Sequence, residues 1–283
     1  MTAGVATADP VVALAGGSDY RSLYYAWEQR QWEAGAIELV ADAAAWSELP
    51  RSLRTRLERA VEWRQLRAET ATQALVRFVD AAPNEEQQVF LTTQLVDEAR
   101  QLVFFDRMRG EVMHVQGASI EARRPDPPQA AATKLVLEDL PATAATLATP
   151  ASDLGALARS IVLYEVVIVG VLGLVEQRAL MERLNKLGAL PGLREGLALT
   201  ARDAERHVAF GLIFLAEAVL VEARNMAHIA AALSDALPHA FSALTAADQS
   251  PSTRNGPGDL VGSARAALDR WFAAVELKLP VVL

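Results

Sequence analysis

The sequence has 283 residues, of which 52% are hydrophobic and 22% charged, and its formal net charge is −8. A chain of this length and composition is expected to form a globular protein with a large core. The negative charge and the lack of clustered Lys and Arg exclude a general nucleic-acid-binding surface. Because the chain has no cysteine, it has no disulfides, no thiolate metal site and no Cys nucleophile.

The N-terminal segment lacks the basic start and the apolar centre of a secretory signal. We therefore expect residues 1–18 to be a flexible tail, residues 19–283 to form a single domain, and the protein to be cytoplasmic. The most apolar run, residues 160–177, contains Glu165, and its uncharged part is too short to span a bilayer comfortably. This run predicts a buried core helix and no membrane insertion.

The predicted elements are helices, because alanine and leucine are abundant and β-branched runs are short. Asn84 is a good N-cap for a helix, and Gly188 followed by Pro191 marks the end of one helix and the start of another. In chain order we predict an amphipathic segment at 19–33, long helices at 50–81, 84–115, 153–186 and 192–223, and shorter helices at 225–246 and 259–276.

A Pro-, Ala- and Thr-rich segment, residues 117–152, separates the second long helix from the third. No strand alternation with hairpin turns and no internal repeat is visible in the sequence. The predicted fold is therefore all-α, with two pairs of long helices and a long crossover between the pairs. This is one of the bundle topologies that hold buried metal sites.

A two-metal site in such a bundle takes one Glu from each of two helices and a Glu-x-x-His pair from each of the others. The spacing i, i+3 places the carboxylate and the imidazole of each pair on one helix face. In chain order, the four long helices offer Glu69, then Glu98 followed by Gln101, then Glu165, and finally His207 preceded by Ala204. Both Glu-x-x-His pairs are therefore broken at one position.

Three stretches carry a resemblance to a known family: "QLVDEARQLVFFDRM" (94–108), "YEVVIVGVLG" (164–173) and "LNKLGALPGLREGLALTARDAERHVAFG" (184–211). They are similar to the ligand-bearing helices of the ribonucleotide-reductase small-subunit-like branch of the ferritin superfamily, and most of all to the R2-like ligand-binding oxidases. The resemblance covers residues 20–225 and implies a ferritin-like four-helix bundle core with additional helices.

The resemblance also implies a ligand set. It places Glu69 and Glu98 on ligand carboxylates and His207 on a ligand histidine. The other three ligand positions hold Gln101, Val169 and Ala204.

Tyr164 matches a tyrosine that in these oxidases can be cross-linked, and Ala71 stands at the position of its partner. Glu165 lies one helical turn from Val169 and so shares its face.

Two carboxylates and one imidazole cannot neutralise two metal ions and fill their coordination shells. We therefore expect no cofactor and a degenerate site that binds or transforms a small apolar molecule, with the acids and His207 as proton-transfer groups. The catalytic candidates are Glu69, Glu98, Gln101, Tyr164, Glu165 and His207.

Two alternatives stay open. The first is a metal-dependent oxidase or oxygenase, with iron or manganese held by Glu69, Glu98 and His207. The second is a non-catalytic paralogue that pairs with an active ferritin-like subunit; a homodimer is expected only by analogy. A purely structural interpretation treats Glu69 as a surface acid, pairs Glu98 with an arginine and gives His207 a nearby carboxylate.

Overall fold

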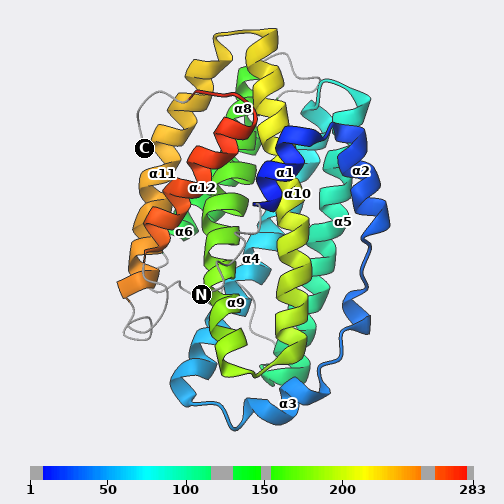
Figure 1. Ribbon diagram of the computed structural model, residues 1–283, viewed down its shortest axis with the longest axis vertical. Helices are drawn as coiled ribbons and strands as arrows, with labels where there is room; N and C mark the ends of the chain where they lie inside the picture. The colour runs from blue at the N-terminus through cyan, green and yellow to red at the C-terminus, as the bar shows by residue number, and fades with distance from the viewer. Residues whose placement is uncertain (1–8, 116–129, 148–153, 250–258, 279–283) are drawn as a thin grey trace, which may run out of the picture.

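The computed structural model describes residues 9–115, 130–147, 154–249 and 259–278. Its centre is formed by two pairs of long helices that run along the longest axis of the molecule (Figure 1). One pair is α4 (Arg51–Ala81) with α5 (Glu85–Arg107). The other is α10 (Pro191–Val221) with the continuous helix over residues 154–187. The predicted bundle of two helix pairs is confirmed.

The helix over residues 154–187 has three parts: α8 (Leu154–Ile161), the π-helical η6 (Val162–Leu174) and α9 (Val175–Leu187). It is long and apolar enough to cross a membrane, but 89% of its most apolar window is buried inside the bundle. Its hydrophobicity is therefore that of a core helix, as the sequence predicts.

Local signals in the sequence explain where these helices begin and end. The side chain of Asn84 accepts a hydrogen bond from the backbone N–H of Gln87 at 3.0 Å and so caps α5. Gly188 has φ +63, the left-handed conformation that favours glycine, and it ends α9. Pro191 then opens α10.

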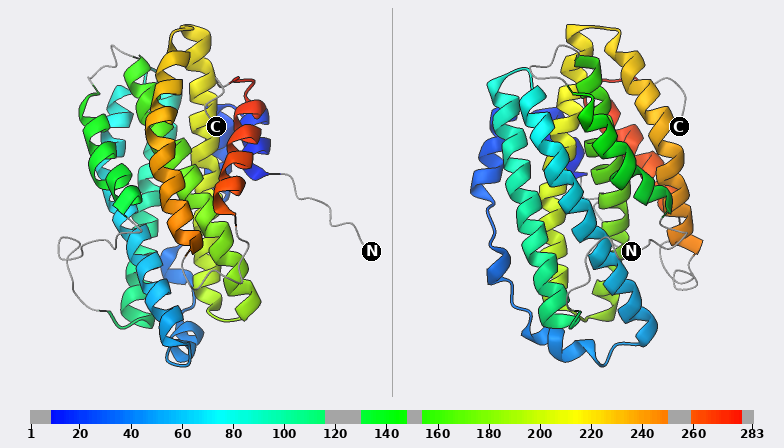
Figure 2. Two further views of the ribbon diagram at one scale, coloured as in Figure 1. Left: turned by 90° about the vertical axis from the view of Figure 1, so that its left-hand side faces the viewer. Right: turned by 180° about the vertical axis from the view of Figure 1, so that it is seen from behind.

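Further helices cover this centre. The additional elements are α1 (Pro10–Gly17), α2 (Tyr20–Gln29), η1 (Ala34–Ala36), α3 (Val40–Trp46), η2 (Met108–Val112), α6 (Ala130–Thr133), η5 (Lys134–Asp139), α7 (Leu140–Ala145), α11 (Asn225–Gln249) and α12 (Leu260–Ala274). Helix α11 packs along α8 and η6, as Figure 2 shows. The long crossover contributes α6, η5 and α7, and its residues 117–129 and 148–152 lie outside the described ranges.

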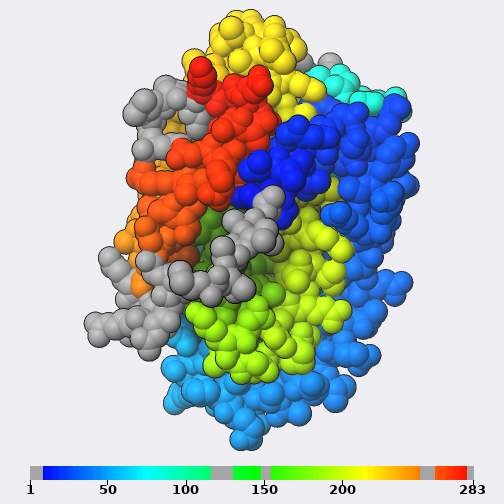
Figure 3. All heavy atoms as spheres, viewed as in Figure 1, coloured from blue at the N-terminus to red at the C-terminus, as the bar shows by residue number. Residues whose placement is uncertain are grey.

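The expectation of a flexible tail over residues 1–18 is wrong for its second half. Residues 10–17 form α1, in which Val11 and Ala15 are buried. This helix packs against α10 and α12, and Figure 3 shows it beside α12 on one face of the molecule. The cap by Asp9, whose side chain accepts from the backbone N–H of Val11, favours the helix. Residues 1–8 lie outside the described part.

The close packing of α5 against α10 gives a first prediction. A Cβ built on Gly196 would lie 1.9 Å from the ring of Phe104, so Gly196→Ala forces two helices apart. We expect it to lower the free energy of unfolding by about 1–3 kcal/mol, measured by urea denaturation. Gly110→Ala is the matched control, because a Cβ on Gly110 has no neighbour within 4 Å. Equal stability of the two variants would contradict the packing described here.

Candidate functional site

One buried polar cluster lies between the two helix pairs and is centred on Glu98 of α5. The hydroxyl of Tyr164 donates to Oε1 of Glu98 at 2.9 Å, whereas Oε2 of Glu98 is buried without a hydrogen-bond partner. Gln94 and Gln101 are also buried, and their spacing of four and three residues from Glu98 places all three on one face of α5. The predicted pair Glu98 and Gln101 therefore does face the bundle interior.

An arginine from α4 enters the same cluster. Arg67 is 6% exposed, and its Nη2 donates to Oε1 of Gln101 at 2.9 Å. A Cβ on Gly173 of η6 would lie 2.9 Å from Nη1 of Arg67, so the glycine leaves room for the guanidinium. Where the family resemblance predicts a metal-binding histidine, this chain thus has an amide that accepts from a guanidinium.

Glu165 is completely buried on η6, and neither of its carboxylate oxygens has a hydrogen-bond partner. Burial raises the pKa of Glu165 well above its usual range. The charge of Glu98 raises this pKa further, whereas nearby Gln94 and the charge of Arg67 oppose the rise, although no hydrogen bond of normal geometry joins Gln94 to Glu165. Burial therefore favours the protonated, neutral form of Glu165, which has a proton to donate.

Tyr164 stays protonated for a similar reason. Burial raises its pKa well above its usual value, and the negative charge of Glu98 adds to the rise. Its ring packs edge-on against Phe78 of α4, with the centroids 5.9 Å apart. The tyrosine is thus held in place as a hydrogen-bond donor to Glu98.

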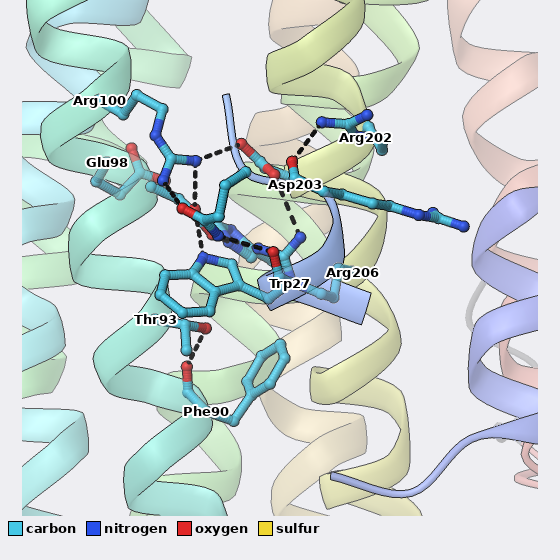
Figure 4. A network of polar contacts seen from close by, with 12 residues as sticks. Trp27, Phe90, Thr93, Glu98, Arg100, Arg202, Asp203 and Arg206 are labelled. Atoms are coloured by element: carbon cyan, nitrogen blue, oxygen red, sulfur yellow. Dashed lines mark hydrogen bonds and ion pairs between the residues drawn. The ribbon is translucent and has the colours of Figure 1, made fainter. Parts of the chain in front are cut away.

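A second buried cluster lies on the adjacent face of α5 and is centred on Asp97. Figure 4 shows Trp27, Arg100, Asp203 and Arg206 of this cluster. Nε2 of His207 lies 2.9 Å from Oδ2 of Asp97, and Arg206 forms an ion pair with the same oxygen. Oδ1 accepts from Nε1 of Trp27 at 2.9 Å and from Arg100 at 3.2 Å. Burial alone would raise the pKa of Asp97, but the hydrogen bond and charge of His207, then the charge of Arg206, outweigh it and lower the pKa.

Asp203 of α10 completes this second cluster. It accepts from Nε1 of Trp32 at 2.8 Å and forms an ion pair with Arg206 at 3.2 Å. Burial raises the pKa of Asp203, and the neighbouring charge of Asp97 adds to the rise. The two clusters therefore meet along α5, where Asp97 and Glu98 are consecutive residues that point into different surroundings.

The structure does not bring the predicted set Glu69, Glu98 and His207 together. Glu69 is exposed, and α4 turns Ala68 and Ala71 toward the core instead. The prediction that Glu69 is an interior ligand is thus wrong. Consecutive residues differ by about 100° around a helix, and Glu69 lies on the outer face of α4. His207 is buried as predicted, but its carboxylate partner is Asp97 rather than Glu98.

The sequence interpretation missed the second cluster. Its signal was present as the same Asp-x-x-Arg spacing on two helices, in "DEAR" of α5 and "DAER" of α10. At i, i+3 the acid and the arginine share a helix face, and here the two pairs meet, with both acids and Arg206 buried and Arg100 partly buried. In the structural interpretation Glu98 pairs with Arg100, Arg206 or another arginine; the first two bind Asp97 instead, and within the described ranges Glu98 forms no ion pair.

A cleft of about 730 Å³ opens on the flank of the bundle, between the crossover helices and α11. Its wall includes the ion pair of Lys134 with Asp139, together with Arg159, His239 and Leu163. Leu163 precedes Tyr164 in η6 and so joins the wall of the cleft to the segment that carries the interior acid. Across the described ranges, no three His, Cys, Asp or Glu side chains gather in a way that could hold a metal ion.

Comparison with known proteins identifies the fold. No family model matches the sequence, and no curated protein is similar enough in sequence to match it. Among solved structures, two variants of an R2-like ligand-binding oxidase with anaerobically reconstituted Mn/Fe cofactor match with TM-scores of 0.77 and 0.78, at 17% and 18% identity. A third variant, with an aerobically reconstituted Mn/Fe cofactor, matches with a TM-score of 0.78 at 18% identity.

These matches extend over nearly the whole length of both chains. Each covers 93% of this chain and 94% or 95% of the oxidase chain. The described part of this chain contains no strand, in agreement with an all-helical bundle. The chain therefore has the ferritin-like fold of the R2-like ligand-binding oxidases, as its sequence resemblance predicts.

Proposed function

We propose that this protein binds a small, largely apolar molecule in the interior of its R2-like bundle, without a dimetal centre, and that Glu165 and Glu98 act on the polar group of that molecule. The observation that carries the proposal is the carboxyl group of Glu165. It is completely buried in an apolar helix, and neither of its oxygens has a partner.

Unpartnered polar atoms gather around Glu165. Oε2 of Glu98, both amide atoms of Gln94 and Nε of Arg67 are also buried without partners. Native proteins satisfy nearly all buried polar groups, because each unsatisfied group costs about 1–3 kcal/mol. A partner that is water or a bound molecule is therefore expected among these atoms, and the apolar surroundings favour a molecule that is itself mostly apolar.

The side chains present do not fit a dimetal centre. Two metal ions in a buried site need several negative ligands. Here Glu69 is exposed, Gln101 is bound by Arg67, and His207 is bound by Asp97. The guanidinium of Arg67, whose charge acts on Glu165 and Tyr164, also adds positive charge where the two ions would require negative charge. The Mn/Fe cofactors of the structural neighbours thus do not carry over to this chain.

The interior groups can instead move a proton. Glu165 is a neutral donor because of its raised pKa, and Oε2 of Glu98 is a free acceptor. A donor and an acceptor held in a water-poor site are the elements of general acid–base catalysis. Tyr164 fixes the other oxygen of Glu98 and so sets the direction of the free one.

The test is to purify the protein from cells supplied with iron and manganese. We expect mass spectrometry to find less than one metal ion per chain and, after organic extraction, a small apolar molecule. Glu165→Leu should lose that molecule, whereas Glu69→Gln, on the exposed face of α4, should keep it.

The other hypotheses predict different results from the same preparation. About two metal ions per chain, lost in Glu98→Ala, would contradict the proposal and support a metal-dependent oxidase. An empty interior in a chain that copurifies with a ferritin-like subunit would contradict it as well, and would support a non-catalytic paralogue.

A further inference from the structure

We propose that Arg67 and Glu98 balance each other's charge at the centre of the bundle, so that the interior ligand is an uncharged molecule that carries a hydroxyl or amide group. This inference rests on the proposed function and narrows it to a class of ligand. It follows from the charge of the interior groups and from the hydrogen-bonding atoms that they leave free.

The positive charge of Arg67 is fixed at this point. A guanidinium stays protonated in proteins, and Arg67 is 6% exposed. Within the described ranges, no carboxylate forms an ion pair with it, and its one hydrogen bond goes to the neutral amide of Gln101. No direct ion pair neutralises its charge, so this charge can balance that of a nearby acid.

Glu98 is the acid whose negative charge Arg67 balances. Glu98 and Gln101 are three residues apart on one helix face, about 5–6 Å between Cβ atoms, and Gln101 holds Arg67. Glu98 and Arg67 also act with opposite sign on the same neighbour, since Glu98 raises the pKa of Tyr164 and Arg67 lowers it. With Glu165 neutral, the positive and negative charges of the centre balance before any ligand enters.

A charged ligand would disturb this balance. Burying an ion without an opposite partner costs several kcal/mol, so both anions and cations are disfavoured. The polar atoms without a hydrogen-bond partner lead to the same conclusion. Arg67 Nε–H and the carboxyl proton of Glu165 are donors, Glu98 Oε2 is an acceptor, and the amide of Gln94 is both. A hydroxyl or a primary amide supplies both kinds of partner, whereas a carboxylate only accepts.

Three probes of nearly equal shape test the inference: benzamide, benzoate and benzamidine, which are neutral, negative and positive near pH 7. Binding is measured by ligand-observed NMR and by thermal shift. We expect the wild-type protein to bind benzamide roughly tenfold more tightly than either ion. Glu98→Gln leaves the charge of Arg67 unbalanced and should shift the preference toward benzoate.

Arg67→Met leaves the charge of Glu98 unbalanced and should shift the preference toward benzamidine. If either Glu98→Gln or Arg67→Met fails to fold, the other variant still tests the inference. Glu69→Gln should keep the wild-type preference. Tighter binding of benzoate or benzamidine to the wild-type protein, or unchanged preferences in a folded variant of either position, would overturn the inference alone. No binding of any probe to any of these proteins would contradict the proposed function itself.

Discussion

Asp97→Asn is expected to lower the free energy of unfolding by about 3–5 kcal/mol, because it removes the buried acid that joins two arginines and a histidine. Asp97 is completely buried and contacts His207, Arg206 and Arg100. The asparagine keeps the shape of the side chain but removes the negative charge beside His207, and it leaves Asp203 as the remaining acid beside Arg206 and Arg100. Urea denaturation at neutral pH measures the difference.

The matched control is Glu86→Gln, which removes an acid from the exposed ion pair with Arg21. Exposed pairs contribute about 0–1 kcal/mol, so this variant should unfold at nearly the wild-type urea concentration. A similarly small effect of Asp97→Asn would show that the buried network contributes little to stability and would contradict the description of the second cluster.

The same comparison has a pH dependence. The pKa of Asp97 is lowered in the folded state, so its stabilisation is present above the unfolded value of about 3.9 and is lost as the pH falls through the folded value. The gap between wild type and Asp97→Asn should therefore narrow only in acid, below about pH 4.

Glu165→Gln is expected to stabilise the protein, and more so at higher pH. The pKa of Glu165 is raised in the folded state, whereas in the unfolded chain the group ionises near pH 4.3. At a pH between the unfolded and the folded pKa of Glu165, the folded state binds one proton more than the unfolded state. Glu165 therefore lowers the free energy of unfolding of the wild type by up to about 1.4 kcal/mol for each pH unit. Glutamine has nearly the same shape and does not ionise, which removes this loss.

The measurement is the free energy of unfolding of the wild type and Glu165→Gln from pH 5 to pH 8. The difference between the two proteins should grow with pH until the pH reaches the raised folded-state pKa of Glu165, whereas Glu69→Gln should run parallel to the wild type. A constant difference, or one that shrinks as the pH rises, would mean that Glu165 is ionised in the folded protein and cannot be the proton donor of the interior.

The long helices could be predicted from the sequence because their signals are local. The cap at Asn84, the stop at Gly188 and the start at Pro191 each act within one turn, and all three are seen in the structure. The apolar run around Glu165 predicted a core helix for the same reason. In contrast, α1 was missed, because its burial depends on contacts with the distant α10 and α12.

The interior could be predicted only in part. Glu98, Tyr164, Glu165 and His207 are buried as expected, but α5 is buried on two faces, so the sequence could not tell whether Asp97 or Glu98 is the partner of His207. That choice depends on the rotation of α10 relative to α5.

Helix α4 presented a related difficulty. It has acids and arginines on several faces, and only the packed bundle shows that Arg67 turns inward while Glu69, two residues later, turns outward.

Anomalous X-ray diffraction at the manganese and iron edges, on crystals grown from protein supplied with both metals, tests the absence of a dimetal centre most directly. We predict no anomalous peak between Glu98 and His207, with the guanidinium of Arg67 beside Gln101. Two peaks about 3.5–4 Å apart, with Glu98 and Glu165 as ligands and Arg67 turned away, would contradict this account.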